Sequence, residues 1–247
     1  MAIADYETAL VTGASAGIGA ATVRALAAKG LAVTAVARRA DRLEALAVET
    51  GCTPLPLALD LTDTKALNEA LRGREVDVLV NNAGLGRGMA SFLEASAEDI
   101  DLTISTNVIA FLHVIHAVAP NMVARKTGHM VNIGSIAGLY PLQSPIYGAS
   151  KGAVRLASQN LRIDLEGSGV RLTEICPGRV VTEFLVQASG EEAARDIYGQ
   201  FDELQPEDIA DAIVYAVDAP WRVNVSTIEI VPTEQIIGGI HTTRVER

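Results

Sequence analysis

The chain has 247 residues, of which 49% are hydrophobic and 20% are charged, and its formal net charge is −10. This length and composition are ordinary for a globular α/β protein and predict a single domain over residues 1–247. The acidic balance, without a clustered basic stripe, argues against nucleic acid or an anionic membrane surface as a partner.

Apolar runs alternate with segments of helical periodicity along the chain. The apolar runs predict strands near Thr8–Thr12, Leu31–Ala37, Thr53–Ala58, Val76–Val80, Gly128–Ile133, Val170–Ile175 and Thr227–Val231. The periodic segments predict helices near Gly17–Lys29, Asp41–Thr50, Thr64–Leu71, Ile100–Arg125, Tyr147–Glu166 and Pro206–Asp218. This alternation predicts a Rossmann-type, doubly wound parallel sheet of seven strands, ordered 3-2-1-4-5-6-7, with helices on both faces.

Two local features refine this fold. Pro54 and Pro56 place the third strand at a sheet edge, where a missing N–H costs little. The segment 180–205 has little periodicity, contains Gly190 and Gly199 and is rich in charge. We expect it to form short helices of a mobile, lid-like segment.

A glycine-rich turn, TGASAGIG at residues 12–19, lies between the first strand and the first helix. Such a turn presents backbone N–H groups to a pyrophosphate. The spacing of Gly13, Gly17 and Gly19 differs from the common dinucleotide fingerprint, and a glycine cluster alone can be a simple helix cap or tight turn. The sequence NNAG at 81–84 closes the fourth strand, at the sheet edge where ligands bind, which favours a dinucleotide site.

The end of the second strand indicates which dinucleotide binds. Enzymes for the non-phosphorylated dinucleotide place a carboxylate there, whereas this chain has Ala37 followed by Arg38 and Arg39. Guanidinium groups suit a 2′-phosphate in charge and geometry, so the sequence predicts NADP. Asp60 is placed to accept a hydrogen bond from the adenine amino group; the alternative is the N-cap of the next helix.

Tyr147 and Lys151 are one helical turn apart and share a helix face, downstream of Ser135. A free tyrosine titrates near pH ~10, and we expect the ammonium and a positive nicotinamide to lower the pKa of Tyr147. Tyr147 would exchange a proton with the substrate oxygen, which Ser135 would hold. On its own, the Tyr147 and Lys151 pair is also typical of an ordinary exposed helix face.

The ordered set of TGASAGIG, NNAG, Asn107, Ser135, Tyr147 with Lys151, and Pro177 with Gly178 resembles the short-chain dehydrogenase/reductase family over essentially the whole chain. The resemblance implies a Rossmann-type oxidoreductase, usually a homotetramer. It also implies a catalytic tetrad, which carries over to Asn107, Ser135, Tyr147 and Lys151.

Within that tetrad, Lys151 would hold the nicotinamide ribose, and Asn107 would anchor a water that links Lys151 to solvent. The alternative for Asn107 is a helix kink or a polar core residue. Twelve residues separate Ser135 from Tyr147, one fewer than in many family members, which leaves Ser144 as a second candidate serine. The cofactor is expected to contact residues from all these segments: Gly13, Ser15, Gly17, Ile18, Gly19, Arg38, Arg39, Asp60, Leu61, Asn82, Ala83, Gly84, Tyr147, Lys151, Pro177, Gly178, Val180 and Thr182.

The segments 204–210 and 225–235 are similar to the NADP-dependent 3-hydroxy acid and serine dehydrogenase branch of the family. That similarity implies a small anionic alcohol or semialdehyde as the substrate. Arg87 and Arg179 follow the NNAG and Pro177-Gly178 motifs and are candidates to clamp its acidic group. Alternatively, both arginines face solvent or bind cofactor phosphate.

Other functions stay open at this stage. They are a reductase for 3-oxoacyl carriers or other ketones, a sugar epimerase, and an NADP-sensing regulator without catalysis. The four histidines show no metal-ligand spacing, so we expect no metal. Cys52 and Cys176 are expected to be free buried thiols, and no signal peptide or membrane-spanning run is visible, so we expect a cytoplasmic protein.

Overall fold

The computed structural model describes residues 2–58, 60–89, 91–141, 144–192, 194, 198–199 and 201–236, and its centre is a parallel sheet of seven strands. The strands are β1 (Thr8–Thr12), β2 (Ala32–Ala37), β3 (Thr53–Ala58), β4 (Val78–Asn81), β5 (His129–Ile133), β6 (Arg171–Pro177) and β7 (Thr227–Ile230). Their order is β3-β2-β1-β4-β5-β6-β7, which confirms the predicted topology. β3 pairs only with β2, so the proline-containing strand lies at an edge as predicted.

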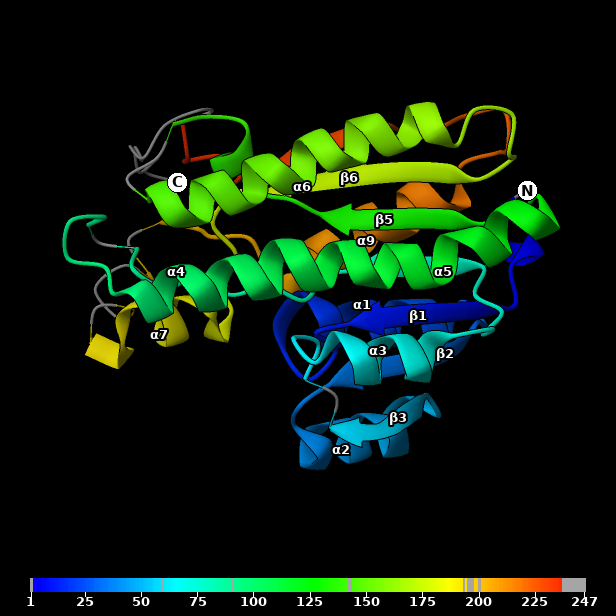
Figure 1. The fold of residues 1–247 in the computed structure, drawn as a ribbon, viewed down its shortest axis with the longest axis horizontal. Helices are drawn as coiled ribbons and strands as arrows, with labels where there is room; N and C mark the ends of the chain where they lie inside the picture. Colours follow the sequence, from blue (N-terminus) through cyan, green and yellow to red (C-terminus); the bar gives the residue numbers. More distant parts are fainter. Residues whose placement is uncertain are drawn as a thin grey trace.

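Helices cover both faces of this sheet (Figure 1). They are α1 (Gly17–Ala28), α2 (Ala40–Thr50), α3 (Thr64–Leu71), α4 (Ala97–Ile104), α5 (Phe111–Arg125), α6 (Pro145–Asp164), α7 (Glu183–Ser189) and α9 (Pro206–Asp218). α3, α4, α5 and α6 lie in front of the sheet in Figure 1, whereas α1, α2 and α9 lie behind it. The molecule therefore has three layers.

Each face of the sheet has its own hydrophobic core. On the α1 and α9 side, Val23 and Ile213 pack against inward residues of β1 and β5 such as Val11. On the α5 side, Val114 and Met122 pack against the opposite faces of the central strands. Central strands buried on both faces explain the continuous apolar runs in the sequence.

The long helix on the front face differs from the prediction in two ways. It begins at Ala97 instead of Ile100, because Ser96 and Asp99 form a capping box. It also contains a π-helical segment at Ser105–Ala110, which widens the helix in its middle.

No run of membrane-spanning length is expected from the sequence, but the helix from Ala97 to Arg125 is long and apolar enough to cross a membrane by length and composition. Its inner residues Val114, Val118 and Met122 are fully buried against the sheet. A core helix with one face on a sheet meets the same criteria of length and hydropathy.

Two further differences concern helix starts. α6 begins at Pro145, two residues before the predicted start at Tyr147, because proline is favourable at the first helical position. Asp63, and not Asp60, is the N-cap of α3 and accepts a hydrogen bond from Ala66 N–H. The alternative interpretation of Asp60 as that cap is therefore wrong. The expectation of short helices after residue 180 is confirmed by α7.

At the amino end of the sheet, polar side chains join strands to helices. Asp77 accepts hydrogen bonds from the N–H groups of Glu7 and Thr8 and from Arg125 Nη1 at 2.6 Å. The buried guanidinium of Arg171 donates to the carbonyls of Val217, Ala219 and Val223 and to the hydroxyl of Tyr6. Its Nε atom has no hydrogen-bond partner among the described residues.

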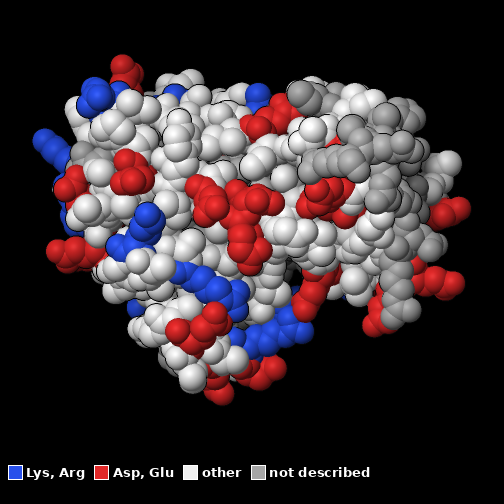
Figure 2. All heavy atoms as spheres, turned by 180° about the vertical axis from the view of Figure 1, so that it is seen from behind, with Lys and Arg blue, Asp and Glu red and all other residues white. Residues whose placement is uncertain are grey.

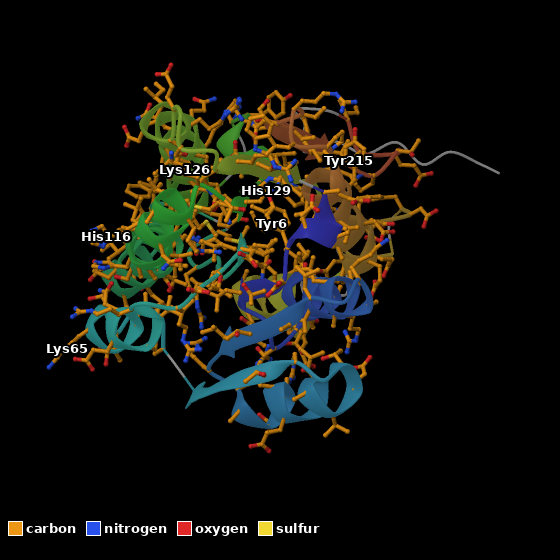
Figure 3. All side chains as sticks on the ribbon, turned by 90° about the vertical axis from the view of Figure 1, so that its right-hand side faces the viewer. Tyr6, Lys65, His116, Lys126, His129 and Tyr215 are labelled. Atoms are coloured by element: carbon orange, nitrogen blue, oxygen red, sulfur yellow. The ribbon has the colours of Figure 1, made fainter. Side chains whose placement is uncertain are left out.

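The side view in Figure 3 places His129 and Tyr6 inside the molecule, between the two helix layers. His116 and Lys65 lie on the outside of one layer, and Tyr215 lies on the other side. Burial lowers the pKa of His129 to about 3, with Arg171 acting in the same direction, so this histidine is a neutral core residue. Within the described part of the chain, no group of three or more His, Cys, Asp or Glu side chains is arranged to hold a metal ion.

Candidate active site

A cavity of about 1510 Å³ opens at the carboxyl ends of the strands. In Figure 1 this edge lies on the left, where α7 and the start of α4 are found. Predicted cofactor residues that line the cavity are Gly13, Ser15, Gly17, Ile18, Arg38, Arg39, Asp60, Leu61, Asn82, Ala83, Gly84, Tyr147, Lys151, Pro177, Gly178, Val180 and Thr182. The volume is large enough for a dinucleotide together with a small substrate.

The glycine turn needs glycine for two separate physical reasons. Gly13 and Gly17 have φ values of +67° and +51°, which side chains with a Cβ rarely adopt. A Cβ on Gly19, which does not line the cavity, would overlap the carbonyl oxygen of Gly13. The turn therefore folds tightly against the start of α1 and leaves the backbone open to the cavity, as a cradle for a pyrophosphate requires.

The NNAG loop is fixed to the end of β1 by hydrogen bonds. Thr12 Oγ1 accepts from the N–H groups of Asn82 and Ala83, each at 3.0 Å. Asn82 Nδ2 donates back to the Thr12 carbonyl at 2.9 Å. These bonds hold the first and fourth strand ends together, so the two predicted cofactor motifs form one wall of the cavity.

The basic residues after β2 form the adenosine end of the cavity. Ala37 is buried at the strand end, and Arg38 is exposed beside it. Arg39 donates through Nε and Nη2 to Ser15 Oγ, at 3.1 and 2.9 Å. These guanidinium groups, with the Ser15 hydroxyl beside Arg39 and no carboxylate in the residues that end β2, suit a phosphate at this position.

Asp60 also lines the cavity and interacts with the charge of Arg38. Burial acts to raise the pKa of Asp60, but hydrogen bonds from Thr62 and the charge of Arg38 bring it below its ordinary value. Asp60 is therefore an anionic acceptor at the cavity wall.

Tyr147 and Lys151 project from the first turns of α6 toward Ser135, which follows β5. Lys151 Nζ donates to the Ile133 carbonyl at 2.8 Å and lies 5.8 Å from the centre of the Tyr147 ring. Ser135 Oγ accepts from Ala137 N–H at 3.1 Å, and Ser135 acts to lower the pKa of the Tyr147 phenol. Three of the four predicted catalytic side chains therefore meet at one place.

Of the two charges expected to lower the pKa of Tyr147, the structure tests that of Lys151, which is not among the causes of the shift. Burial raises the pKa of Tyr147 to about 12, and the hydrogen bond with Ser135 acts in the opposite direction. The sequence analysis expects the Lys151 ammonium to lower it, but that ammonium is bonded to a backbone carbonyl. Burial also lowers the pKa of Lys151 to about 8, against the opposing effects of Cys176 and Glu174.

Asn107 lies in the π-helical segment and is buried behind the NNAG loop. Its Nδ2 donates to the Leu85 carbonyl and to Ser150 Oγ, and its Oδ1 accepts from Leu85 N–H. A Cβ on Gly84 would lie 3.3 Å from Asn107 Oδ1 and 3.5 Å from Lys151 Nζ. Asn107 is therefore a buried polar residue in an irregular helix, and its Oδ1 and Lys151 Nζ both face Gly84.

The remaining candidates are also placed at the cavity. Ser144 lies at the start of α6, and its buried Oγ has no hydrogen-bond partner in the described part of the chain. Arg87 is exposed and shares the cavity wall with Glu94 and Asp99. Arg179 is half-buried, and its guanidinium stacks 4.8 Å from the centre of the Phe201 ring.

Residues that the sequence analysis missed come mainly from α7. The Phe184 ring lies 5.2 Å from the Tyr147 ring, centre to centre, and Glu183 forms ion pairs with Arg39 and Arg42. Thr182 is the N-cap of α7, and the sequence of threonine followed by glutamate is a helix-start signal that could have located these residues.

A second missed group lies beneath the catalytic side chains. Glu174 is almost fully buried, pairs with Arg155 at 3.3 Å, and would touch any Cβ placed on Gly134. Burial raises the pKa of the adjacent Cys176 thiol to about 12, and Glu174 reinforces this shift. Cys52 and Cys176 are both free and buried, as predicted.

Comparison with known proteins identifies the family. Residues 7–193 match the short chain dehydrogenase family, so the chain belongs to that family. It is 38% identical over 245 residues to serine 3-dehydrogenase of Rhizobium radiobacter, covering 96% of this chain and 98% of the relative. It is 41% identical over 244 residues to the NADP-dependent 3-hydroxy acid dehydrogenase of Salmonella typhi, covering 95% and 98%.

Comparison with solved structures agrees with this family assignment. The closed form of serine dehydrogenase complexed with NADP+ superposes with a TM-score of 0.88 at 38% identity, covering 96% of this chain and 100% of that one. Serine dehydrogenase from Escherichia coli superposes with a TM-score of 0.80 at 37% identity, covering 93% and 99%. The predicted family and fold are confirmed.

Proposed function

We propose that the protein is an NADP(H)-dependent oxidoreductase that interconverts a small alcohol and its aldehyde or ketone. The observation that carries the proposal is the phenol of Tyr147, which lies one helical turn from Lys151 and lines, with Lys151 and Ser135, the cavity that begins at the glycine turn. Relatives named as NADP-dependent dehydrogenases, and serine dehydrogenase solved with NADP+, support it.

The cavity has the donors that NADP needs. The open backbone at Gly13 and Gly17 would receive the pyrophosphate, and Arg38 and Arg39 would receive the 2′-phosphate. Asp60 would accept from the adenine amino group. When bound, the cofactor supplies or accepts the hydride.

In the direction of reduction, Tyr147 donates its proton to the carbonyl oxygen. A pKa of about 12 keeps the phenol protonated at neutral pH, ready to act as an acid. Ser135 Oγ accepts a hydrogen bond from the main-chain N–H of Ala137. The hydroxyl hydrogen of Ser135 is therefore available to the substrate oxygen. That bond would stabilise the developing alkoxide.

In the direction of oxidation, Tyr147 has to lose its proton. Lys151 uses one N–H on the Ile133 carbonyl and has two further donors for the ribose hydroxyls. Asn107 uses both side-chain N–H groups on Leu85 and Ser150. A relay water beside Gly84 would therefore bond to an oxygen of Asn107 and to Lys151, and would connect Lys151 to solvent.

The substrate we propose is a small 3-hydroxy acid or the corresponding semialdehyde. Two relatives are named as acting on serine and on 3-hydroxy acids. Arg179 is the better candidate for binding an acidic group, because its Nη1 is enclosed without a partner among the described residues. Arg87 is the weaker candidate, since Glu94 and Asp99 line the same part of the cavity.

We further propose one domain over residues 1–247, with the segment 180–205 as a lid over the site, in a cytoplasmic homotetramer. The contact of Phe184 with Tyr147 supports the lid. Exposed apolar side chains on α5 and α6, such as Leu112, Leu156 and Ile163, support subunit contacts through these helices. Free buried thiols accord with a reducing compartment.

A substrate panel tests the proposal. NADPH oxidation is followed at ~340 nm with malonic semialdehyde, sulfoacetaldehyde, neutral aldehydes and ketones, and a 3-oxoacyl thioester, with NADH in parallel. Serine and 3-hydroxypropionate with NADP+ test the reverse direction. We expect turnover of the charged compounds with the phosphorylated cofactor, reduced at least tenfold in Arg179→Ala through KM. Turnover of the thioester alone would favour the carrier reductase, and NADPH binding without turnover would favour a sensor.

A further inference from the structure

The carboxylate of Glu183 joins two arginines at the adenosine end of the cavity. Its Oε2 accepts from Arg39 Nη1 at 2.6 Å, and its Oε1 accepts from Arg42 Nη1 at 2.5 Å. Between 36% and 42% of each of these three side chains is exposed. The two ion pairs are therefore accessible to a ligand and to salt.

Glu183 is the first residue of α7, so these ion pairs tie the helix to the cofactor wall. The neighbouring Thr182 lies against the glycine turn, since a Cβ on Gly17 would be 3.0 Å from Thr182 Cγ2. Phe184, on the other side, contacts Tyr147. The start of α7 thus touches both the adenosine end and the catalytic end of the cavity.

The charges in this region suit an exchange of anions. Arg38, Arg39 and Arg42 carry three positive charges; the Glu183 carboxylate pairs with Arg39 and Arg42, and the charge of Arg38 acts on Asp60. A phosphate monoester carries a charge of about −1.5 to −2 at neutral pH and is the stronger acceptor for guanidinium groups. A phosphate that binds Nη1 of Arg39, which lines the cavity, takes a donor that Glu183 occupies. Figure 2 shows that acidic side chains are spread over the visible face, while the largest group of basic side chains lies in its lower part.

We infer that Glu183 is a specificity-determining residue that competes with the 2′-phosphate of the cofactor for Arg39 and Arg42. The inference depends on the proposed NADP function. Without the phosphate, the carboxylate keeps both arginines paired and in place. When the phosphate binds, it displaces the carboxylate. This displacement lowers the affinity of the protein for the cofactor, so the cofactor leaves faster after turnover. By reciprocity, binding of the phosphate to the arginines weakens the ion pairs by which Glu183 ties α7 to the cofactor wall.

Two small probes separate the phosphate from the rest of the cofactor. Adenosine 2′,5′-bisphosphate carries the 2′-phosphate, and adenosine 5′-monophosphate lacks it. Their Kd values are measured by calorimetry at low salt for the wild type, Glu183→Gln and Glu183→Asp. Glu49→Gln is the matched control, because it removes a carboxylate from the Arg24 ion pair between α1 and α2, outside the cavity.

We expect Glu183→Gln to bind the bisphosphate about threefold to tenfold more tightly, and the monophosphate within about twofold of the wild type. Glu183→Asp, which keeps the charge, should stay nearer to the wild type, and Glu49→Gln should change neither Kd. The gain should shrink at high salt. In the wild type, amide hydrogen exchange in α7 should be faster with the bisphosphate than with the monophosphate.

Two results would overturn the inference and are distinguishable. If the wild type binds both probes equally, the NADP assignment itself fails. If the wild type prefers the bisphosphate but Glu183→Gln leaves that preference unchanged or weakens it, the NADP assignment stands and Glu183 does not compete. Thermal unfolding of each variant establishes that the folded protein was compared.

Discussion

At the amino end of the sheet, both oxygens of Asp77 are bonded to β1 and α5, whereas at the carboxyl end Ser144 Oγ and Arg179 Nη1 are enclosed without partners among the described residues. Both regions bury polar groups at strand ends. At the amino end, Arg171 Nε and His129 Nδ1 also lack partners among the described residues, but Arg171 makes four other hydrogen bonds and His129 Nε2 bonds to Thr173 Oγ1. Near-complete pairing is typical of a polar group that holds the fold, and incomplete pairing indicates a group arranged for a ligand.

The strongest test of the carboxyl end is Tyr147→Phe. We expect kcat for NADPH-dependent reduction to fall by about 10³-fold, because the proton donor is lost while the ring still packs against Phe184. The Kd for NADPH should stay within about twofold. Stopped-flow absorbance and fluorescence titration measure the two quantities.

Tyr140→Phe is the matched control, since Tyr140 bonds to Glu229 and lies outside the cavity lining. Activity retained in Tyr147→Phe, or lost equally in Tyr140→Phe, would contradict the role of Tyr147.

Asp77→Asn tests the amino end. We expect the free energy of unfolding to fall by about 2–4 kcal/mol, because Arg125 loses its ionic partner in a largely buried pair. Activity at 25 °C should change by less than about twofold. Urea unfolding measures the stability, and steady-state kinetics measure the activity. A large loss of activity with unchanged stability would contradict a purely structural role for Asp77.

The same variant has a defined pH dependence. Burial acts to raise the pKa of Asp77, but the bonds from Arg125, Glu7 and Thr8 lower it below its ordinary value. A carboxyl with a lowered pKa stabilises the fold fully above its unfolded pKa, and this contribution is lost as pH falls through the folded value. The difference in stability between wild type and Asp77→Asn should therefore be constant above about pH 5 and shrink below pH ~4. A difference that persists at pH ~2 would show that charge is not its origin.

Ser96→Ala tests a purely structural cap near the site. Ser96 Oγ accepts from Asp99 N–H at 3.1 Å at the start of α4. We expect a loss of about 1 kcal/mol in the free energy of unfolding, with unchanged KM. A change in KM without a change in stability would show that Ser96 acts on ligand binding and not on the fold.

Ser144→Ala should have the smallest effect. Its hydroxyl makes no hydrogen bond to described residues, so removal should leave stability unchanged or raise it by up to about 1 kcal/mol. Activity should be retained if Ser135 is the catalytic serine, and Ser135→Ala should lose about 10²-fold or more. A loss in Ser144→Ala that matches the loss in Ser135→Ala would make Ser144 the catalytic serine.

The sequence predicted the sheet because its strands are buried on both faces and read as plain apolar runs. It missed helix starts that depend on a cap, as at Ser96 and Pro145, since periodicity begins only inside the helix. Asn107 suggested a helix kink as one alternative, but the π-helical segment around it was not predicted, because one extra residue in a turn alters the spacing too little to detect.

Within the site, motifs located Ser135, Tyr147 and Lys151, whose roles depend on types of side chain at fixed spacing. Glu183 was not predicted as a site residue, because its partners, Arg39 and Arg42, lie about 140 residues earlier in the sequence. The raised pKa of Tyr147 was also beyond the sequence, because it depends on burial and on a lysine that is bonded elsewhere.

The pH dependence of the two reaction directions tests the role of Tyr147 most directly. Reduction of malonic semialdehyde with NADPH and oxidation of 3-hydroxypropionate with NADP+ are measured from pH ~6 to ~10 under single-turnover conditions. A phenol with a raised pKa predicts an oxidation rate that rises by up to about tenfold per pH unit and a reduction rate that does not rise, apart from a step at about pH 8 where Lys151 titrates in both directions. Equal pH dependence in both directions, or the same rise in the residual activity of Tyr147→Phe, would contradict the account.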